Sequence, residues 1–279
     1  MNELFELRRT AVIDQIVSEG LITHVDWFQE IDSTNAYLKR FLNQNPVSGL
    51  PRLVLADRQT AGRGRGKNAW WSPDGCLMFS LAWRPSKTDI HENIEWQSRL
   101  VQLPLVVGIA VAKALSGFLK DGNSVKVKWP NDVYIHQKKV CGILIESIVG
   151  VDEPFWIVGA GVNVLVPIAD APEPIRSNAT SLHLECARSF RETLCVESIL
   201  LAIVQSLQAT FDDWQSNNDF LHQVWSQHCF LTDRLVDIQT SGRNLQGTCI
   251  GIDDSGALVL RDQKGLLHCV LSGVVQSWQ

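Results

Sequence analysis

Residues Ala61 to Pro73 read Ala-Gly-Arg-Gly-Arg-Gly-Lys-Asn-Ala-Trp-Trp-Ser-Pro, so three glycines alternate with three cations ahead of a tryptophan pair. Glycine allows positive φ and lets backbone N–H groups approach a ligand with no Cβ in the way. Arg63 and Arg65 carry planar, permanently charged guanidinium groups that match pairs of phosphate or carboxylate oxygens. We therefore expect a loop that binds an anion, with a solvated basic loop as the alternative.

This cationic loop is a local feature of an acidic protein. The chain has 279 residues and a net charge of −5. Its length suggests one large domain or about two. The hydrophobic fraction of 45% and the charged fraction of 20% are typical of a soluble globular protein with a proper core. The negative net charge argues against a broad basic surface for nucleic acid.

Targeting and metal signals are weak throughout the chain. Residues 1–6 lack a cationic region followed by an apolar run, so no signal peptide is expected. The longest apolar stretch, Leu103 to Leu115, is too short to span a bilayer. The seven cysteines are scattered without a Cys-x-x-Cys pair, and the histidines lack metal-ligand spacing. These features predict a cytoplasmic protein with free thiols and no structural metal.

Strands and helices are expected on both sides of the loop. A buried strand over 53–56 enters it, and an apolar strand over 76–83 follows it. Helical periodicity over 102–120 predicts a helix that ends at Asp121-Gly122. Segment 167–178 contains three prolines and is expected to be a loop that orders around a ligand. Other helices are predicted over 1–20, from 32–35 through 41, over 196–215 and over 219–229, and other strands over 22–29, 125–129, 140–146 and 155–164.

The sequence changes character near Leu231. Short strands over 235–238, 246–252, 257–260 and 266–271 are separated by turns such as Asp253-Asp254-Ser255-Gly256. This pattern predicts a small all-β barrel or sandwich. We therefore divide the chain into a catalytic domain at 1–230 and a C-terminal β domain at 231–279.

A second polar cluster lies among the central strands. Lys128-Trp129-Pro130-Asn131-Asp132 places a cation before a turn that carries an amide and a carboxylate, and Lys139 follows. If these segments pair as a hairpin, Asp132 and Lys139 can converge on one ligand. Gly142, inside an otherwise apolar strand, indicates that another group approaches the backbone closely. The alternative is solvated surface lysines and ordinary turn residues.

In order and spacing, these motifs resemble the biotin–protein ligase family from about Val25 to the C-terminus. Five motifs that occur in the same order as in the family carry the resemblance. The motifs are Ser33-Thr34-Asn35; Gln59 with the Gly62 to Arg65 loop, Trp70 and Ser72-Pro73; Lys128 to Asp132; Lys139 to Leu144; and Gly159 to Asn163.

The resemblance implies a fold and a reaction. The fold is α/β (α+β): a class II synthetase-like mixed sheet with helices, capped by a small Src-homology-3-like β-barrel. Biotin's carboxylate attacks the α-phosphate of ATP, giving biotinyl-5′-AMP and pyrophosphate. A lysine of a biotin carboxyl carrier protein domain, part of a biotin-dependent carboxylase, then takes the biotinyl group. Mg²⁺ is expected on the ATP oxygens rather than on protein side chains.

The resemblance also implies the site residues. Lys139 bridges the biotin carboxylate and the α-phosphate, because an anion attacking an anion needs a cation where charge develops. Arg63 and Arg65 clamp the phosphates, and Asp132 orients Lys139 or accepts a proton from the incoming lysine. The biotin contacts are Ser33, Thr34, Asn35, Gln59, Arg63, Gly64, Arg65, Lys139 and Gly142. The ATP contacts are Arg63, Arg65, Trp70, Lys128, Asn131, Lys139 and Asn163, the last at the adenine edge.

Some of these residues have a purely structural alternative. Ser33 and Asn35 are also helix-cap candidates, and Trp71 is expected to pack in the core. The stretch Gly66 to Ala69 departs from relatives that carry further arginines there, which leaves additional phosphate contacts unassigned.

Several functional alternatives remain at this point. A lipoate or octanoate ligase shares the fold, although the two central motifs favour the biotin branch. A nucleic-acid-binding protein conflicts with the net charge, and a peptide-binding C-terminal module lacks an aromatic groove. The 32 residues before Ser33 are too few for a helix-turn-helix with a linker, so no DNA-binding role is expected. The identity of the carrier stays open, as does homodimer formation through a sheet edge.

Overall fold

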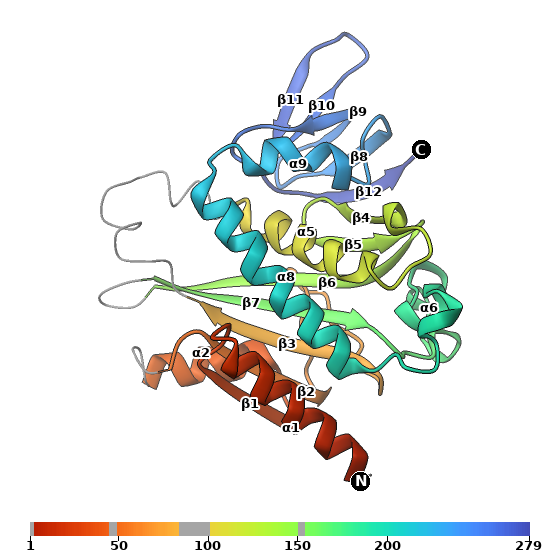
Figure 1. The fold of residues 1–279 in the computed structure, drawn as a ribbon. Helices are drawn as coiled ribbons and strands as arrows, with labels where there is room; N and C mark the ends of the chain where they lie inside the picture. Colours follow the sequence, from red (N-terminus) through yellow and green to blue (C-terminus); the bar gives the residue numbers. More distant parts are fainter. Residues whose placement is uncertain (1–2, 45–48, 84–100, 150–153) are drawn as a thin grey trace.

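The structure is a computed structural model that describes residues 3–44, 49–83, 101–149 and 154–279. Its central element is a mixed sheet with the spatial order β1-β2-β3-β7-β6-β5-β4 (Figure 1). β1 and β2 pair in parallel, and the other neighbours are antiparallel. The strands are β1 (His24–Ile31), β2 (Arg52–Gln59), β3 (Cys76–Trp83), β4 (Val125–Lys128), β5 (Asp132–Ile135), β6 (Lys138–Val149) and β7 (Pro154–Asn163).

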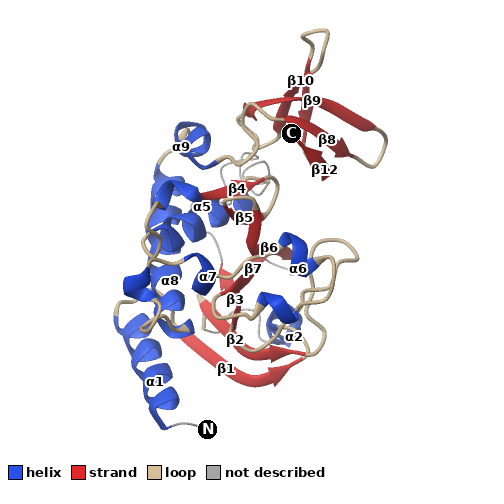
Figure 2. Ribbon diagram, turned by 90° about the vertical axis from the view of Figure 1, so that its right-hand side faces the viewer, coloured by secondary structure: helices blue, strands red, loops and turns tan. Residues whose placement is uncertain are grey.

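Helices cover both faces of this sheet, and most of them gather on one side (Figure 2). α5 (Leu103–Ser116) lies between the sheet and α8 (Val196–Ser216), and α1 (Glu3–Ser18) packs on α8. α2 (Thr34–Gln44) contacts the sheet through β3 and β7, on the other face. No described helix is long and apolar enough to cross a membrane. The remaining helices are α9 (Phe220–His228), the short α6 (Ile175–Asn178) and α7 (Leu182–Glu185), and the 3₁₀ turns Gly122–Ser124, Ile168–Asp170 and Arg188–Phe190.

The predicted elements are present, but two predictions need correction. The helix expected to run to Lys120 ends at Ser116, whose hydroxyl lies 2.7 Å from the Ala112 carbonyl and 2.9 Å from that of Gly122. The predicted loop 167–178 contains a 3₁₀ turn and α6. Glu173 organises the second of these, because its carboxylate accepts from Arg176 and Ser177 within the same turn.

The C-terminal segment forms a separate antiparallel sheet with the order β11-β10-β9-β8-β12, which confirms the all-β prediction. The sequence pattern did not reveal β12, which pairs with β8 at one edge of this sheet. The domain boundary after residue 230 stays a prediction. The strands are β8 (Leu235–Gln239), β9 (Asn244–Ile252), β10 (Leu258–Arg261), β11 (Leu267–Val270) and β12 (Val274–Trp278).

The two sheets are joined by polar and aromatic contacts beside β4 and β5. The indole Nε1 of Trp129 donates to the Gly256 carbonyl at 3.2 Å, and the Gln102 side chain donates to the Asp254 carbonyl at 2.7 Å. Trp278 packs edge-on against Tyr134, with ring centroids 6.1 Å apart. These contacts hold the C-terminal sheet against the strands that carry the Lys128 to Asp132 motif.

Candidate active site

One cavity of about 330 Å³ collects most of the predicted site residues. Residues from both sheets line it, and the C-terminal contribution comes from Gly273, Val274 and Val275, which the sequence did not indicate. Asn163 is absent from the lining, because its side chain is buried at the end of β7 and donates to the Thr180 carbonyl at 3.0 Å. The predicted residues that line the cavity are Ser33, Thr34, Asn35, Gln59, Arg63, Gly64, Arg65, Trp70, Lys128, Asn131, Asp132, Lys139 and Gly142.

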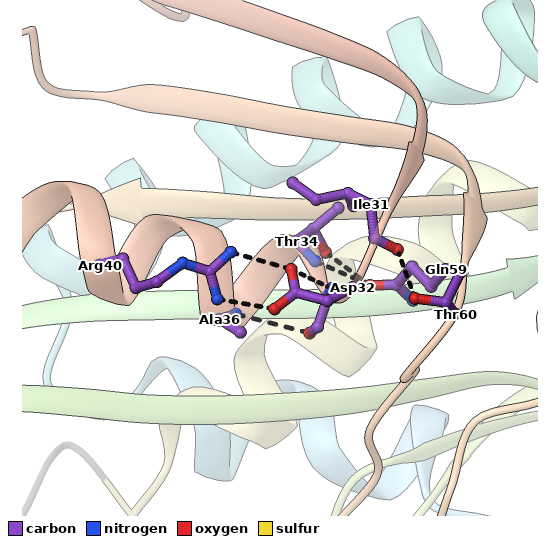
Figure 3. A network of polar contacts seen from close by, with 8 residues as sticks. Ile31, Asp32, Thr34, Ala36, Arg40, Gln59 and Thr60 are labelled. Atoms are coloured by element: carbon purple, nitrogen blue, oxygen red, sulfur yellow. Dashed lines mark hydrogen bonds and ion pairs between the residues drawn. The ribbon is translucent and has the colours of Figure 1, made fainter.

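Thr34 and Gln59 meet where α2 begins beside the end of β2. The backbone N–H of Thr34 donates to Gln59 Oε1 at 2.8 Å, and the Thr34 hydroxyl lies 3.2 Å from the same oxygen (Figure 3). Asp32 supports this turn by accepting from the Ser33 N–H and from Arg40. The Arg40 guanidinium holds the pKa of Asp32 below its ordinary value. These contacts orient a hydroxyl and an amide beside the cavity.

Two residues that the sequence did not single out complete this polar region. The Ser80 hydroxyl, in the middle of β3, lies 2.5 Å from Asn35 Oδ1 and 2.7 Å from Thr34 Oγ1. Glu146, on β6, accepts from Asn35 Nδ2 at 2.9 Å. A Cβ on Gly159 would lie 2.2 Å from Asn35 Oδ1, which explains the glycine. We refer to Thr34, Asn35, Gln59 and Ser80 as the amide–hydroxyl cluster.

The glycine–arginine stretch forms a tight loop at the cavity. The Gly64 N–H donates to the Asn68 carbonyl at 2.8 Å, and Gly66 closes the turn with φ of 66°. Arg63 forms an ion pair with Glu146 at 3.1 Å. Arg65 donates to the Gly273 carbonyl, and its burial lowers its pKa. The loop therefore contacts both the central sheet and the segment that precedes β12.

The position of the Trp70 ring explains why β6 and β7 carry the glycines Gly142 and Gly161 beside it. Its ring lies against β6 and β7, where a Cβ on Gly142 or Gly161 would come within 2.9 or 2.4 Å of it. The Lys139 Nζ lies 5.6 Å from the ring centroid. The close approach predicted at Gly142 is confirmed, and Trp70 and Lys139 are the groups that approach it. Trp71 packs, half-buried, against the small cluster around Cys76 and Met78.

The central strands place two lysines around one carboxylate. Asp132 pairs in register with Lys128 on β4 and Gly142 on β6, so the predicted hairpin geometry is confirmed. Lys139 Nζ lies 2.6 Å from Asp132 Oδ1. Asn131 Nδ2 donates to the Ile143 carbonyl at 2.6 Å, which holds the turn against β6.

Lys128 is buried among aromatic rings. Its Nζ lies 4.0 Å from the centroid of the Trp278 ring and 5.3 Å from that of Tyr134. Burial lowers the pKa of Lys128 to about 8, although the Asp132 carboxylate acts in the opposite direction. We refer to Arg63, Arg65, Lys128 and Lys139 as the cationic cluster. It adjoins the amide–hydroxyl cluster in the same cavity.

Comparisons with known proteins match both the part of the chain that carries the cavity and the C-terminal segment. Residues 27–163 match the model of the biotin/lipoate A/B protein ligase family, and residues 233–278 match that of the biotin protein ligase C-terminal domain. A biotin–[acetyl-CoA-carboxylase] ligase of Paracoccus denitrificans is 30% identical over 241 residues, which cover 84% of this chain and 92% of that protein. The chain belongs to the biotin protein ligase family.

Further members of the biotin protein ligase family are similar in sequence or in fold. A bifunctional ligase/repressor BirA of Bacillus spizizenii is 30% identical over 89% of this chain and 73% of its own length. The structure of a biotin protein ligase from Aquifex aeolicus in complex with biotin and ATP superposes with a TM-score of 0.69. It is 28% identical and covers 92% of this chain and 98% of its own. The expected fold, a mixed sheet with helices followed by a C-terminal all-β sheet, is therefore confirmed.

Proposed function

We propose that this protein is an ATP-dependent biotin–protein ligase that forms biotinyl-5′-AMP and transfers biotin to a lysine of a carrier domain. The observation that carries the proposal is that three residues of the amide–hydroxyl cluster and all four of the cationic cluster line one cavity; the three are Thr34, Asn35 and Gln59. Biotin's ureido ring has N–H donors and a carbonyl acceptor, which suit amides and hydroxyls. Its carboxylate and the phosphates of ATP suit the four cations.

In the first step, a biotin carboxylate oxygen forms a bond to the α-phosphorus, and the bond from that phosphorus to the bridging oxygen breaks to release pyrophosphate. Both reactants are anions, so cations are needed where charge accumulates. We assign Lys139 to the space between the carboxylate and the α-phosphate, and Arg63, Arg65 and Lys128 to the phosphate oxygens. Asp132 holds the Lys139 ammonium by an ion pair of 2.6 Å.

In the second step, the amine of the carrier lysine attacks the acyl carbon, AMP leaves, and the amine loses a proton. A lysine has a reference pKa of about 10.4 and is mostly charged at neutral pH, so it needs a nearby base. Asp132 is our candidate, because it is the carboxylate among the described residues that line the cavity. The same residue thus orients Lys139 first and accepts a proton later.

The donor set also suits Mg²⁺ carried by ATP. Magnesium in nucleotide sites is commonly held by one or two carboxylates together with substrate phosphates. Asp132 lines the cavity but is already paired with Lys139, so we assign the ion to the ATP oxygens rather than to a protein side chain. When bound, Mg²⁺ would neutralise phosphate charge next to these residues.

Other parts of the assignment remain predictions. Asn163 and Trp70 are proposed to meet the nucleotide, and Ser33, Gly64 and Asn131 to shape the site through their backbone or amide groups. A cytoplasmic location is proposed on the sequence alone, and homodimer formation is left open. A carrier domain is the proposed protein partner. A lipoate ligase is the competing assignment, and the match to a C-terminal domain model of biotin ligases favours biotin over it.

The test is transfer of biotin to a carrier domain. The protein is incubated with biotin, ATP, Mg²⁺ and a biotin carboxyl carrier domain, and intact mass reports whether one biotinyl group is added. The matched control is a carrier with its acceptor lysine changed to arginine. Modification of the first carrier alone supports the proposal. A parallel reaction contains lipoate in place of biotin, and attachment of lipoate but not of biotin would identify a lipoate ligase.

A further inference from the structure

Ser80 and Glu146 occupy positions that the proposed mechanism leaves without a role. Ser80 is completely buried in β3, and the Glu146 side chain is 16% exposed on β6. Neither residue lines the cavity, yet each contacts Asn35, which does. Their contacts form a continuous chain that runs from Arg63 through Glu146, Asn35 and Ser80 to Thr34.

The hydrogen bonds in this series have a defined donor-to-acceptor direction, which Glu146 sets. An ionised carboxylate only accepts hydrogen bonds, so the Asn35 amide must present its nitrogen to Glu146. The Leu144 carbonyl, 3.4 Å from Asn35 Nδ2, imposes the same orientation. Asn35 Oδ1 then faces Ser80 at 2.5 Å and can only accept. The Ser80 hydroxyl therefore donates its single proton to Asn35 Oδ1.

The direction continues to the Thr34 hydroxyl. Thr34 Oγ1 has two neighbours that accept: Ser80 Oγ at 2.7 Å and Gln59 Oε1 at 3.2 Å. With the Ser80 proton committed to Asn35, the Thr34 proton goes to one of these two oxygens. In either arrangement the hydroxyl proton is used within the protein, and the Thr34 oxygen keeps only lone pairs to offer a ligand. Thr34 lines the cavity and is 4% exposed.

We propose that Ser80 and Glu146 are positioning residues that make Thr34 a hydrogen-bond acceptor and so select acids whose head group carries an N–H. This inference rests on the proposed biotin ligase function and deepens it. The two N–H groups of a ureido ring match such an acceptor, whereas the dithiolane head of lipoate offers no donor. A ligand without a donor leaves a buried acceptor unsatisfied, which is where the discrimination arises.

The chain also connects the head-group region to the cationic loop. Glu146 uses one carboxylate oxygen for Asn35 and the other for Arg63. The ion pair with Arg63 thus fixes the Glu146 carboxylate beside Asn35, and its second oxygen keeps the Asn35 amide in one orientation. A change at Glu146 should therefore alter ligand choice without removing any side chain that lines the cavity.

The test compares E146Q and S80A with the matched control E30Q, a change at an exposed carboxylate of β1. E146Q lets the side chain donate to Asn35, and S80A removes the hydroxyl that relays the direction. The measured quantities are kcat/KM for biotin and for lipoate in ATP–pyrophosphate exchange, the Kd for biotin by calorimetry, and the melting temperature. We expect the preference for biotin over lipoate to fall about tenfold or more in both variants, mainly through weaker biotin binding. E30Q should keep the wild-type preference.

A preference for biotin unchanged in both variants would overturn the inference, because a merely structural role changes stability and leaves ligand choice intact. If E146Q fails to fold, S80A decides, since it removes one oxygen and adds no bulk. A wild-type protein that shows neither biotin binding nor exchange would overturn the proposed function itself. A wild type that is active with biotin, together with variants of equal preference, would overturn only the roles of Ser80 and Glu146.

Discussion

The amide–hydroxyl cluster and the cationic cluster meet at one cavity, which Ser80 reaches only through Thr34 and Asn35, and the two clusters are held in different ways. Thr34, Asn35 and Ser80 are each less than 5% exposed and bond mainly to one another and to Gln59. The cations take their partners from elsewhere: Glu146 for Arg63, the Gly273 carbonyl for Arg65, and Asp132 for Lys139. The amide–hydroxyl cluster is preorganised to bind a neutral polar group. The cationic cluster has hydrogen-bond and ion-pair partners that a bound anion can replace.

This difference separates recognition from chemistry. Buried hydrogen-bonded groups cost free energy when left unpaired, so the amide–hydroxyl cluster should decide which acid binds. Cations placed where charge develops lower the barrier, so the cationic cluster should decide how fast the acid is activated. Changes in the two clusters should therefore have separable effects on ligand choice and on rate.

The largest effect is expected from Lys139→Ala. Removing the ammonium proposed to bridge the two reacting anions should lower the pyrophosphate exchange rate about 10²–10³-fold. The side chain is 31% exposed, so the melting temperature should change little. Lys138→Ala, at the exposed neighbour, is the control and should retain activity. Full exchange activity in Lys139→Ala would remove this residue from the mechanism.

A pH effect on ATP binding is expected next. Burial lowers the pKa of Lys128 to about 8, so its ammonium is lost as the pH rises through that value. If the charge binds phosphate, KM for ATP should rise up to about tenfold per pH unit above 8, while KM for biotin stays flat. Lys128→Arg keeps its charge across this range and should abolish the rise. The same rise in both proteins would exclude Lys128 as the titrating group.

Gly161→Ala tests how Trp70 is seated. The new methyl group would lie 2.4 Å from Trp70 Cε2, and β7 is held between β3 and β6, so the ring must move. Overpacking of this kind costs about 1–3 kcal/mol of unfolding free energy. Urea denaturation and the exchange rate should both report the change. Gly242→Ala, where a Cβ meets nothing within 4 Å, should leave both near wild type.

The smallest effect is expected from Arg65→Ala. It removes a proposed phosphate clamp and the contact with the Gly273 carbonyl beside β12. Free biotinyl-AMP should then leak from the protein several-fold faster, which chromatography of the released nucleotide would detect. Arg243→Ala, at an exposed turn, provides the comparison. Equal leakage from both variants with normal turnover would show that Arg65 does not retain the intermediate.

Much of the cationic cluster could be predicted because its residues belong to local motifs. Lys128, Asp132 and Lys139 lie within 12 residues of one another, and hairpin pairing alone brings them together. The strands could also be predicted from short-range patterns, because apolar runs such as 76–83 and the alternation of strands and turns near the C-terminus each indicate β-structure locally. The helix end at Ser116 was predicted poorly because side-chain bonds to two carbonyls decide it.

The rest depends on contacts between distant residues. Arg65 meets Gly273 across 208 positions, which no local pattern indicates. Ser80 and Glu146 each lie in an apolar stretch of the sequence. The signal that could have indicated them is a single polar residue within a strand expected to be buried. Asn163 belongs to a motif, yet its amide is committed to Thr180, so its proposed contact with adenine needs a direct test.

The most direct measurement is ATP–pyrophosphate exchange by the purified protein with Mg²⁺, run with biotin, with lipoate and with neither acid. We expect exchange with biotin and background rates in the other two reactions. Exchange with lipoate in place of biotin would contradict the assignment of the amide–hydroxyl cluster. No exchange with either acid, from folded protein, would contradict the assignment of the cationic cluster to acid activation.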